Sequence, residues 1–320
     1  VYTFQRAADP ELAFTGNTPG FVFSSAGYAG ARVGDDDLTA IIELERYQPI
    51  APGLLAEVNL YCRESYEGRS LEETANQPIG SGPYQFVEWV RDDYLLMERW
   101  EEFDLLDVGF DQIVWRVIPE NSTRTAELIA GNVDIIANVP SDQHDAVNAS
   151  GNATVQAVDG LRRIFVGFNL TDVFDEEYPV AAEAIKNTDV RVALQYAIDV
   201  PTICSALLGV ECERPTSLVN PPNQNPNLEP YPYDPDTARQ LLDEAGYTVQ
   251  EDGFRFDVRL QAGRNRYLND VNIVQAICQY LSDIELNVEC DLQDFGAEFI
   301  PNLVSQQAGP LYFVGSGGGN

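Results

Sequence analysis

The chain has 320 residues, of which 44% are apolar and 10% aromatic, enough for a sizeable core and two or three domains. It carries 51 acidic side chains against 19 basic ones, for a formal net charge of −32. Because nucleic acid phosphates repel such a chain, this composition argues against DNA or RNA as a partner. No apolar run approaches the roughly 20 residues that a membrane-spanning helix needs.

The acidity has two explanations, and the sequence leaves both open. A carboxylate-rich surface suits a protein that works at high salt, where screening weakens the repulsion between like charges. The same composition would arise in an acidic secreted protein whose genome prefers arginine, since Lys186 is the single lysine.

Strand patterns dominate the first half of the chain after a loop-rich start. Alternating or continuous apolar runs predict strands at residues 38–45, 81–90, 94–100, 112–118, 133–139 and 162–170. Residues 123–131 predict one helix, which ends at Gly131. The tryptophans Trp89, Trp100 and Trp115 lie within or next to these strands, and we expect them to be core residues.

Helices and strands alternate in the second half, which indicates an α/β architecture. Three aspartates, Asp189, Asp199 and Asp234, are placed to cap helices, and Gly209 and Gly246 to end them. A helix at residues 273–284 separates predicted strands at 254–261 and 286–292, and a last strand is expected at 311–314.

The five cysteines are too few for a disulfide scaffold, and they lack the spacing of a zinc site. Cys204 and Cys212 bracket the expected helix end at Gly209, so we predict a disulfide between them. Cys278 and Cys290, on a helix and the strand after it, form a pair that the sequence leaves open.

Four Asn-X-Ser/Thr triplets are compatible with glycosylation outside the cytoplasm, although such triplets also arise by chance. The asparagines concerned are Asn121, Asn148, Asn152 and Asn169.

The residues needed for catalysis are not arranged in any recognisable pattern. The one histidine, His144, lies in a polar turn, and no serine or cysteine has a histidine-based nucleophilic setting. Pairs of carboxylates carry no information among so many acids. We therefore expect no enzymatic activity and no cofactor.

The last predicted strand runs into the glycine-rich sequence GSGGGN at residues 315–320. This sequence matches the first two glycines of a dinucleotide-binding G-x-G-x-x-G motif, but Asn320 stands where the third belongs. No helix pattern follows that would hold a pyrophosphate. We interpret the glycines instead as positions that allow close backbone approach to a ligand or a tight hinge turn.

Five segments, in this order and at these spacings, resemble extracellular solute-binding protein family 5, the peptide- and nickel-type receptors of ABC importers. They are GSGPYQFVEWVRDDYLLMERW, ENSTRTAELIAGNVDII, DVRVALQYAIDVPTICSALLG, YDPDTARQLLDEAGY and the block around IVQAICQYLSDIELNVEC. The resemblance covers residues 77–320 well and the earlier part more loosely. Members of the family are longer, so this chain resembles an internal fragment.

The resemblance implies a two-lobed α/β fold of the periplasmic-binding-protein type (type II, peptide-binding cluster), with mixed sheets flanked by helices. Lobe I would comprise a loop-rich part, 1–76, and a sheet-containing core, 77–168; residues 169–320 would form an incomplete lobe II. The implied function is capture of a peptide or similar small solute for delivery to a membrane permease. It would act in the periplasm or outside the cell, tethered to the outer face of the membrane. The alternative is a structural or adhesive surface protein that uses the same fold.

Two segments would face the ligand if the family arrangement holds. The first is the strand that carries Arg163, Phe165, Gly167 and Asn169, for which the alternative is a buried strand with Asn169 satisfying a turn.

The second segment is the loop 262–270, with Arg264, Arg266 and Tyr267. Arginine suits a ligand carboxylate, and tyrosine would stack or hydrogen-bond. The alternative is a helix N-terminus capped by Asn269 or Asp270.

Ser316 and Gly317 of the glycine-rich end would line the same cleft. Ser316 stands where the family has a tryptophan, and the family's following aspartate is missing, so capture of a peptide amino terminus there is in doubt.

Overall fold

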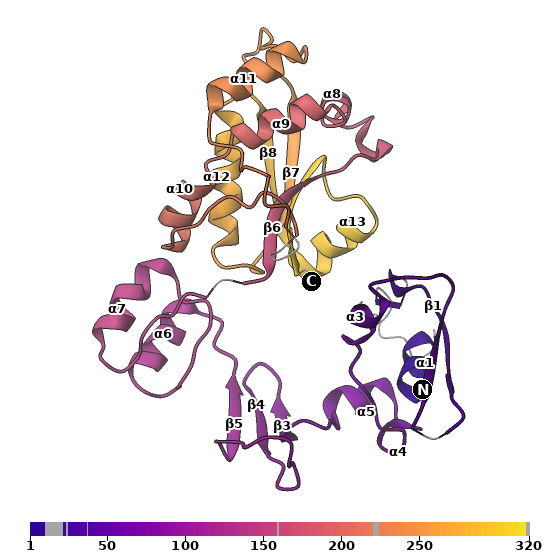
Figure 1. Ribbon diagram of the computed structural model, residues 1–320. Helices are drawn as coiled ribbons and strands as arrows, with labels where there is room; N and C mark the ends of the chain where they lie inside the picture. The colour runs from indigo at the N-terminus through magenta and orange to yellow at the C-terminus, as the bar shows by residue number, and fades with distance from the viewer. Residues whose placement is uncertain (10–21, 24, 37, 159, 220–223, 318–320) are drawn as a thin grey trace. The chain divides into compact units, whose positions relative to one another are not determined.

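The computed structural model describes residues 1–9, 22–23, 25–36, 38–158, 160–219 and 224–317 (Figure 1). The chain divides into two compact units, Val1–Pro119 and a second that begins at Glu120. The division expected at residues 168/169 falls inside the second unit, because the strand that ends at Phe168 pairs with the last strand of the chain.

The first unit contains two antiparallel sheets and four short described helices. One sheet pairs β1 (Tyr28–Val33) with β2 (Ala40–Leu44), and the other has the order β3-β4-β5, from Tyr84–Val90, Tyr94–Arg99 and Gln112–Arg116. The strands predicted for this part of the chain are therefore confirmed. The helices are α1 (Tyr2–Ala8), α3 (Ala51–Leu55), α4 (Arg63–Tyr66) and α5 (Leu71–Asn76).

The expectation that all three tryptophans are core residues is wrong for two of them. Trp89 and Trp115 are 45% and 61% exposed, whereas Trp100 is half-buried against Phe103. A strand pattern predicts the pairing of the backbone, but whether a face of the sheet is covered depends on other parts of the fold.

The second unit is built on a four-stranded mixed sheet with the order β6-β9-β7-β8. β7 (Asp257–Arg264) runs parallel to β8 (Asn287–Asp294) and to β9 (Leu311–Gly317), while β6 (Arg162–Phe168) is antiparallel to β9. The carboxyl ends of the three parallel strands therefore meet at one edge of the sheet, beside the start of β6.

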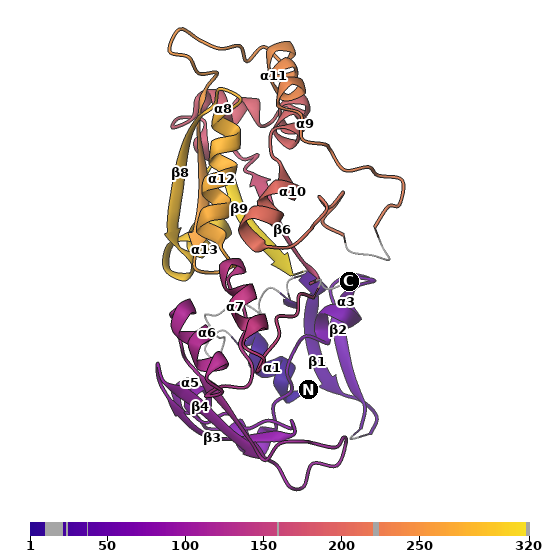
Figure 2. The same ribbon diagram turned by 90° about the vertical axis from the view of Figure 1, so that its left-hand side faces the viewer.

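Helices cover both faces of this sheet (Figures 1 and 2). On one face the buried apolar residues of the sheet pack with α8 (Pro179–Ala184), α9 (Thr188–Tyr196), α11 (Pro235–Glu244) and α12 (Asp270–Ser282). On the other face lie the π-helical turn η4 (Phe295–Phe299) and α13 (Ile300–Val304), where Phe295 packs directly on Gly263 of β7. The α/β architecture predicted for this half is confirmed.

Two of the three predicted aspartate caps are confirmed. Asp234 accepts a hydrogen bond from the Thr237 amide at the start of α11. Asp199 accepts one from the Thr202 amide at the start of α10 (Val200–Ile203). The prediction for Asp189 is wrong, because Asn187 caps α9 and accepts a bond from the Asp189 amide. The helix begins at Thr188, two residues earlier than a cap at Asp189 would place it.

The segment between the two units' sheets differs from prediction. α6 (Asn121–Ile129) begins two residues before the expected helix, and residues 133–139 are irregular, with two bends, instead of a strand. Ile135 is 88% exposed and Asn138 has a φ of 58°, so the apolar run neither pairs with a strand nor reaches a core. Three short elements follow in this unit: η1 (Ser141–Gln143), α7 (His144–Ala149) and η2 (Asp172–Phe174).

The structure contains two disulfides. The predicted bond between Cys204 and Cys212 is confirmed, with the Cα atoms 6.0 Å apart across the end of η3 (Cys204–Leu208). Gly209, at a φ of 66°, turns the chain back between them. Cys278 and Cys290, which the sequence left open, join α12 to β8, and Cys62 is a free, exposed thiol.

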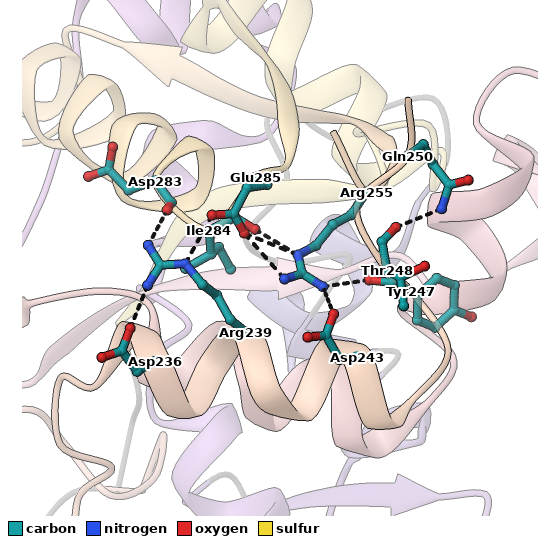
Figure 3. Close-up of polar contacts among 10 residues, drawn as sticks. All are labelled: Asp236, Arg239, Asp243, Tyr247, Thr248, Gln250, Arg255, Asp283, Ile284 and Glu285. Atoms are coloured by element: carbon teal, nitrogen blue, oxygen red, sulfur yellow. Dashed lines mark hydrogen bonds and ion pairs between the residues drawn. The ribbon is translucent and has the colours of Figure 1, made fainter. Parts of the chain in front are cut away.

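Two arginines anchor α11 to the turn between α12 and β8 (Figure 3). Arg255, whose side chain is 3% exposed, donates to Asp243, to Glu285 and to the carbonyl of Tyr247. Arg239 reaches the other oxygen of Glu285, at 3.0 Å, and also bonds Asp236. These guanidinium groups are saturated with partners, which identifies them as structural.

Candidate functional site

The candidate site lies at the edge where β7, β8 and β9 end. In open α/β sheets, ligands bind outside the carboxyl ends of the parallel strands, because the loops that leave the sheet diverge there. This edge carries the loop 265–269, which joins β7 to α12, and the last described residues of β9. Most of the residues predicted to bind a ligand lie here.

Asp270 holds the loop in shape from inside the protein. Its side chain is 3% exposed, and its carboxylate accepts bonds from the amides of Asn265 at 3.2 Å, Arg266 at 2.7 Å and Tyr267 at 2.8 Å. It also accepts from the Val271 amide. A carboxylate with several charge-assisted amide bonds is a rigid anchor. Asp270 therefore fixes the loop that precedes α12, whereas no side chain caps the helix itself.

Asn269 has a different role from the one expected of a cap. It adopts a φ of 56° and its side chain makes no capping bond to α12. Its amide donates instead to the carbonyl of Leu207 in η3, at 2.8 Å. The loop is thereby joined to the segment that the first disulfide closes.

The hydroxyl of Tyr267 hydrogen-bonds β9 just beyond the point where the pairing between β7 and β9 ends. Pairing between β7 and β9 reaches Phe313, and beyond it the Gly315 amide donates to the Tyr267 hydroxyl oxygen at 2.7 Å. The hydroxyl lies 3.4 Å from the Gly315 carbonyl oxygen. A side chain thus satisfies the backbone groups that a strand would otherwise pair, and it positions the end of β9.

Gly315 makes room for this arrangement. A Cβ atom at this position would lie 3.0 Å from the Tyr267 ring and 3.1 Å from the side chain of Arg162. The glycine therefore permits the close approach that its sequence context predicted, but the group that approaches is a tyrosine of the same chain.

Two guanidinium groups lie against the Tyr267 ring. Those of Arg162, at the start of β6, and Arg266 are each 5.9 Å from the ring centroid, and Arg266 is also 5.3 Å from that of Phe295. Phe295 and Phe313 pack edge-on against Tyr267. The rings give the two cations a rigid platform, and cation–π attraction contributes about 0.5–1 kcal/mol at such exposed positions.

The structure brings some of the predicted site residues together at this edge. Arg163 pairs with Ser316 across β6 and β9, and Gly317 pairs with Arg162. Arg264 is the last residue of β7, and Arg266 lies in the loop that follows. Both side chains are exposed. Phe165 lies two residues beyond Arg163 on β6, where it is half-buried and paired with Val314. Gly318, Gly319 and Asn320 of the glycine-rich end lie outside the described residues.

Gly167 and Asn169 lie elsewhere and serve the fold. Antiparallel pairing places them near the start of β9, beside Tyr312 and Pro310. A Cβ at Gly167 would come within 2.3 Å of the Tyr312 ring, so this glycine makes room for a side chain. Asn169 is 8% exposed, donates to the Gln306 carbonyl at 2.8 Å and accepts from Thr171. The arginine loop therefore lies at the opposite end of the β6–β9 pairing from Asn169.

Sequence reasoning missed Arg162. The available signal was its place beside Arg163 at the start of a strand in a very acidic chain. Its position against Tyr267 required the register of β6 on β9, which the sequence does not reveal.

The four sequon asparagines differ in their surroundings. Asn121 and Asn148 are exposed. The side-chain amide of Asn152 donates to the Ile129 carbonyl, and that of Asn169 is bonded within its turn.

Within the described ranges, no group of three or more His, Cys, Asp or Glu side chains is placed to hold a metal ion. None of the described helices has both the length and the apolar character needed to cross a membrane.

The fold of the chain matches that of solved structures. The periplasmic binding protein DppA from Helicobacter pylori, in complex with the peptide STSA, matches with a TM-score of 0.76 at 21% identity, over 98% of this chain and 60% of that one. NikZ from Campylobacter jejuni, in complex with Ni(L-His), matches with a TM-score of 0.71 at 20% identity, over 98% and 60% of the two chains. The fold is therefore that of the type II periplasmic binding proteins for peptides and nickel.

The chain belongs to family 5 of the bacterial extracellular solute-binding proteins. The family model described as "Bacterial extracellular solute-binding proteins, family 5 Middle" matches residues 1–320. A glutathione-binding protein GsiB from Pectobacterium atrosepticum is 26% identical over 249 residues, which are 76% of this chain and 45% of that protein. The GsiB of Escherichia coli K12 is also 26% identical, over 70% of this chain and 41% of its own length. The chain thus spans less than half the length of these relatives.

Proposed function

We propose that this chain is part of the substrate-binding protein of an ABC importer, which captures a peptide or similar small solute and delivers it to a membrane permease. The observation that carries the proposal is the group of arginines at the carboxyl edge of the second unit's sheet. Arg162 and Arg266 are held on aromatic rings, and neither forms an ion pair with any carboxylate of the described chain.

The chemistry of this edge suits recognition of an anionic group. A guanidinium group offers several N–H donors in one plane and binds a carboxylate with two parallel hydrogen bonds. Solute peptides carry such a carboxylate at their C-terminus, and the relatives named above bind glutathione, a peptide or a nickel–histidine complex. Arg264 and Arg266 are the residues that we assign to contacts with ligand carboxylates.

Binding in this class involves no chemical change of the ligand. Closure of two lobes around a solute excludes water, and the few polar contacts that remain become stronger in the drier environment. We assign the sheet β6-β9-β7-β8 and the helices packed on it to one lobe, and the sheet β3-β4-β5 to the other. We also propose that the protein acts in the periplasm or outside the cell, tethered to the outer face of the membrane.

The alternative of an adhesive or structural surface protein is not favoured. The acidity and the Asn-X-Ser/Thr triplets suit such a protein, but neither feature accounts for arginines that are positioned and left without acidic partners. The relatives named above are binding proteins for small solutes.

A thermal-shift titration of the whole protein tests the proposal. The panel should contain short peptides, glutathione and Ni²⁺ with L-histidine, at a fixed salt concentration. A ligand that binds the folded state raises the melting temperature with its concentration, because unfolding must then release it. A melting temperature that no member of the panel changes would overturn the proposed function.

A further inference from the structure

The arginines of the second unit fall into two groups. Away from the carboxyl edge, each one donates to at least one neighbouring oxygen: Arg124, Arg191, Arg214, Arg239, Arg255 and Arg259. At the edge, Arg162 makes one long bond, 3.4 Å, to the Gly315 carbonyl. The side chains of Arg163, Arg264 and Arg266 make no hydrogen bond or ion pair within the part of the chain that the structure describes.

This separation is unexpected for the composition. With 51 acidic residues and 19 basic ones, a cation on this surface has a large excess of carboxylates available to it. Elsewhere the chain uses them: Lys186 bonds two aspartates, Asp172 and Asp175. Arginines that are gathered in one place repel one another, and an anionic ligand relieves that repulsion.

The geometry sorts the unpaired arginines into two positions. Arg162 and Arg266 lie on the same Tyr267 ring, so their guanidinium carbons are less than twice 5.9 Å apart. Arg264 is the last residue of β7, the strand next to β9. Because side chains alternate along a strand, Arg264 shares a sheet face with Ala262 and Leu260, the face on which Arg162 lies with Gly315. Arg163 points to the opposite face.

The Tyr267 ring makes the first position rigid. Its hydroxyl is bonded to Gly315 and its edges pack on Phe295 and Phe313, so the platform under both guanidinium groups is fixed before a ligand arrives. A stacked guanidinium still directs its N–H groups outward in the plane. Little ordering is then needed on binding, which favours affinity.

We infer that this edge selects solutes that carry two anionic groups, with one carboxylate between Arg162 and Arg266 and the second at Arg264. The inference rests on the proposed function and narrows its substrate class to acidic peptides and other dicarboxylates. A peptide supplies one carboxylate at its C-terminus and the other on an aspartate or glutamate side chain. A single C-terminal carboxylate would leave one of the two positions without a counter-charge.

Isothermal titration calorimetry with two peptides of equal size tests this. The whole protein is titrated with Ala-Glu-Ala and with Ala-Gln-Ala at one salt concentration, so that the peptides differ in charge and hardly in shape. We expect Ala-Glu-Ala to bind about tenfold more tightly or better, the effect of one charge-assisted hydrogen bond. Arg162→Gln and Arg266→Gln should each reduce this preference, and Arg162→Lys should retain part of it.

Lys186→Gln is the matched control, because it changes the net charge by the same amount at a surface ion pair outside this edge. It should leave the preference unchanged. Equal affinity of the wild-type protein for the two peptides, or a preference that survives in both glutamine variants at positions 162 and 266, would overturn the inference and leave the proposed function standing. If neither of these peptides nor any solute of the thermal-shift panel binds, the proposed function itself fails. Melting temperatures of the variants verify that each one is folded.

Discussion

Two groups of arginines in the second unit differ in what surrounds them. Arg239 and Arg255 lie on either side of Glu285 (Figure 3), and their N–H groups are used by carboxylates and backbone carbonyls. Arg162 and Arg266 lie on the Tyr267 ring and have no acidic partner among the described residues. The residue type is the same, so the number of partners and the degree of burial distinguish an anchor of the fold from a candidate binding group.

In a chain as acidic as this one, paired and unpaired arginines call for different explanations. An arginine that meets a carboxylate is the expected outcome and needs no functional explanation. An arginine that is held in place and left without a carboxylate does need one, and two such residues, Arg162 and Arg266, lie on one ring at a single sheet edge. The following substitutions separate the two groups by measuring stability and binding independently.

The largest effect is expected for Arg255→Ala. The side chain is 3% exposed and bonds Asp243, Glu285 and the Tyr247 carbonyl, so its removal leaves a cavity and unpaired groups. We expect a loss of about 3 kcal/mol in the free energy of unfolding, the low end for breaking a buried pair. Urea denaturation measures it. An unchanged unfolding midpoint would show that this network does not anchor α11.

Arg266→Ala and Arg264→Ala should give the opposite result. Each should weaken an anionic ligand by about 1.5–3 kcal/mol, the range for a charge-assisted hydrogen bond. The free energy of unfolding should change by no more than about 1 kcal/mol, because both side chains are exposed and make no ion pair in the described chain, and Arg266 loses only its cation–π contacts. Calorimetry and urea denaturation on the same samples measure the two quantities. A loss of stability without a loss of affinity would place these residues with the structural group.

Asp270→Ala should affect both quantities. The buried carboxylate is the common acceptor for four backbone amides, and its removal leaves them without that partner. We expect a loss of about 2 kcal/mol in the free energy of unfolding, together with weaker ligand binding because Arg266 and Tyr267 lose their support. Asp270→Asn, which keeps an acceptor oxygen, should lose less of both. Equal losses in the two variants would mean that the charge, and not the acceptor, matters.

The smallest effect is expected for Tyr267→Phe. This change keeps the ring beneath the arginines and removes the hydroxyl that pairs with Gly315. We expect a loss of about 1 kcal/mol in the free energy of unfolding. Hydrogen exchange of the Gly315 amide should become faster, while the exchange of core amides such as Leu260 serves as the internal reference. An unchanged exchange rate at Gly315 would contradict the role of the hydroxyl as a continuation of β7.

The site shows where sequence reasoning succeeds and where it stops. The loop with Arg264, Arg266 and Tyr267 was predicted from composition and resemblance, and it lies beside the end of β9 as expected. Gly167 and Asn169 were included because they share a strand with Arg163, yet they lie at the other end of the pairing. The sequence gives the spacing of these residues along β6, but it does not show that the partner strand β9 runs antiparallel to β6.

The features that the sequence predicts correctly depend on residues close to one another along the chain. These are the alternation of helices and strands after residue 180, the caps at Asp199 and Asp234, and the disulfide across Gly209. Each requires groups within a few residues of one another, so local spacing contains the information.

The tertiary structure decided everything that depends on strand register and on which faces are covered. Arg162 meets Tyr267 only because β6 pairs with β9 in one particular register, and Trp89 and Trp115 are exposed because pairing alone does not bury a ring. The run at residues 133–139 has the pattern of a strand but no strand to pair with in the described structure. A strand needs a partner to satisfy its backbone groups, and the choice of partner is a property of the whole fold.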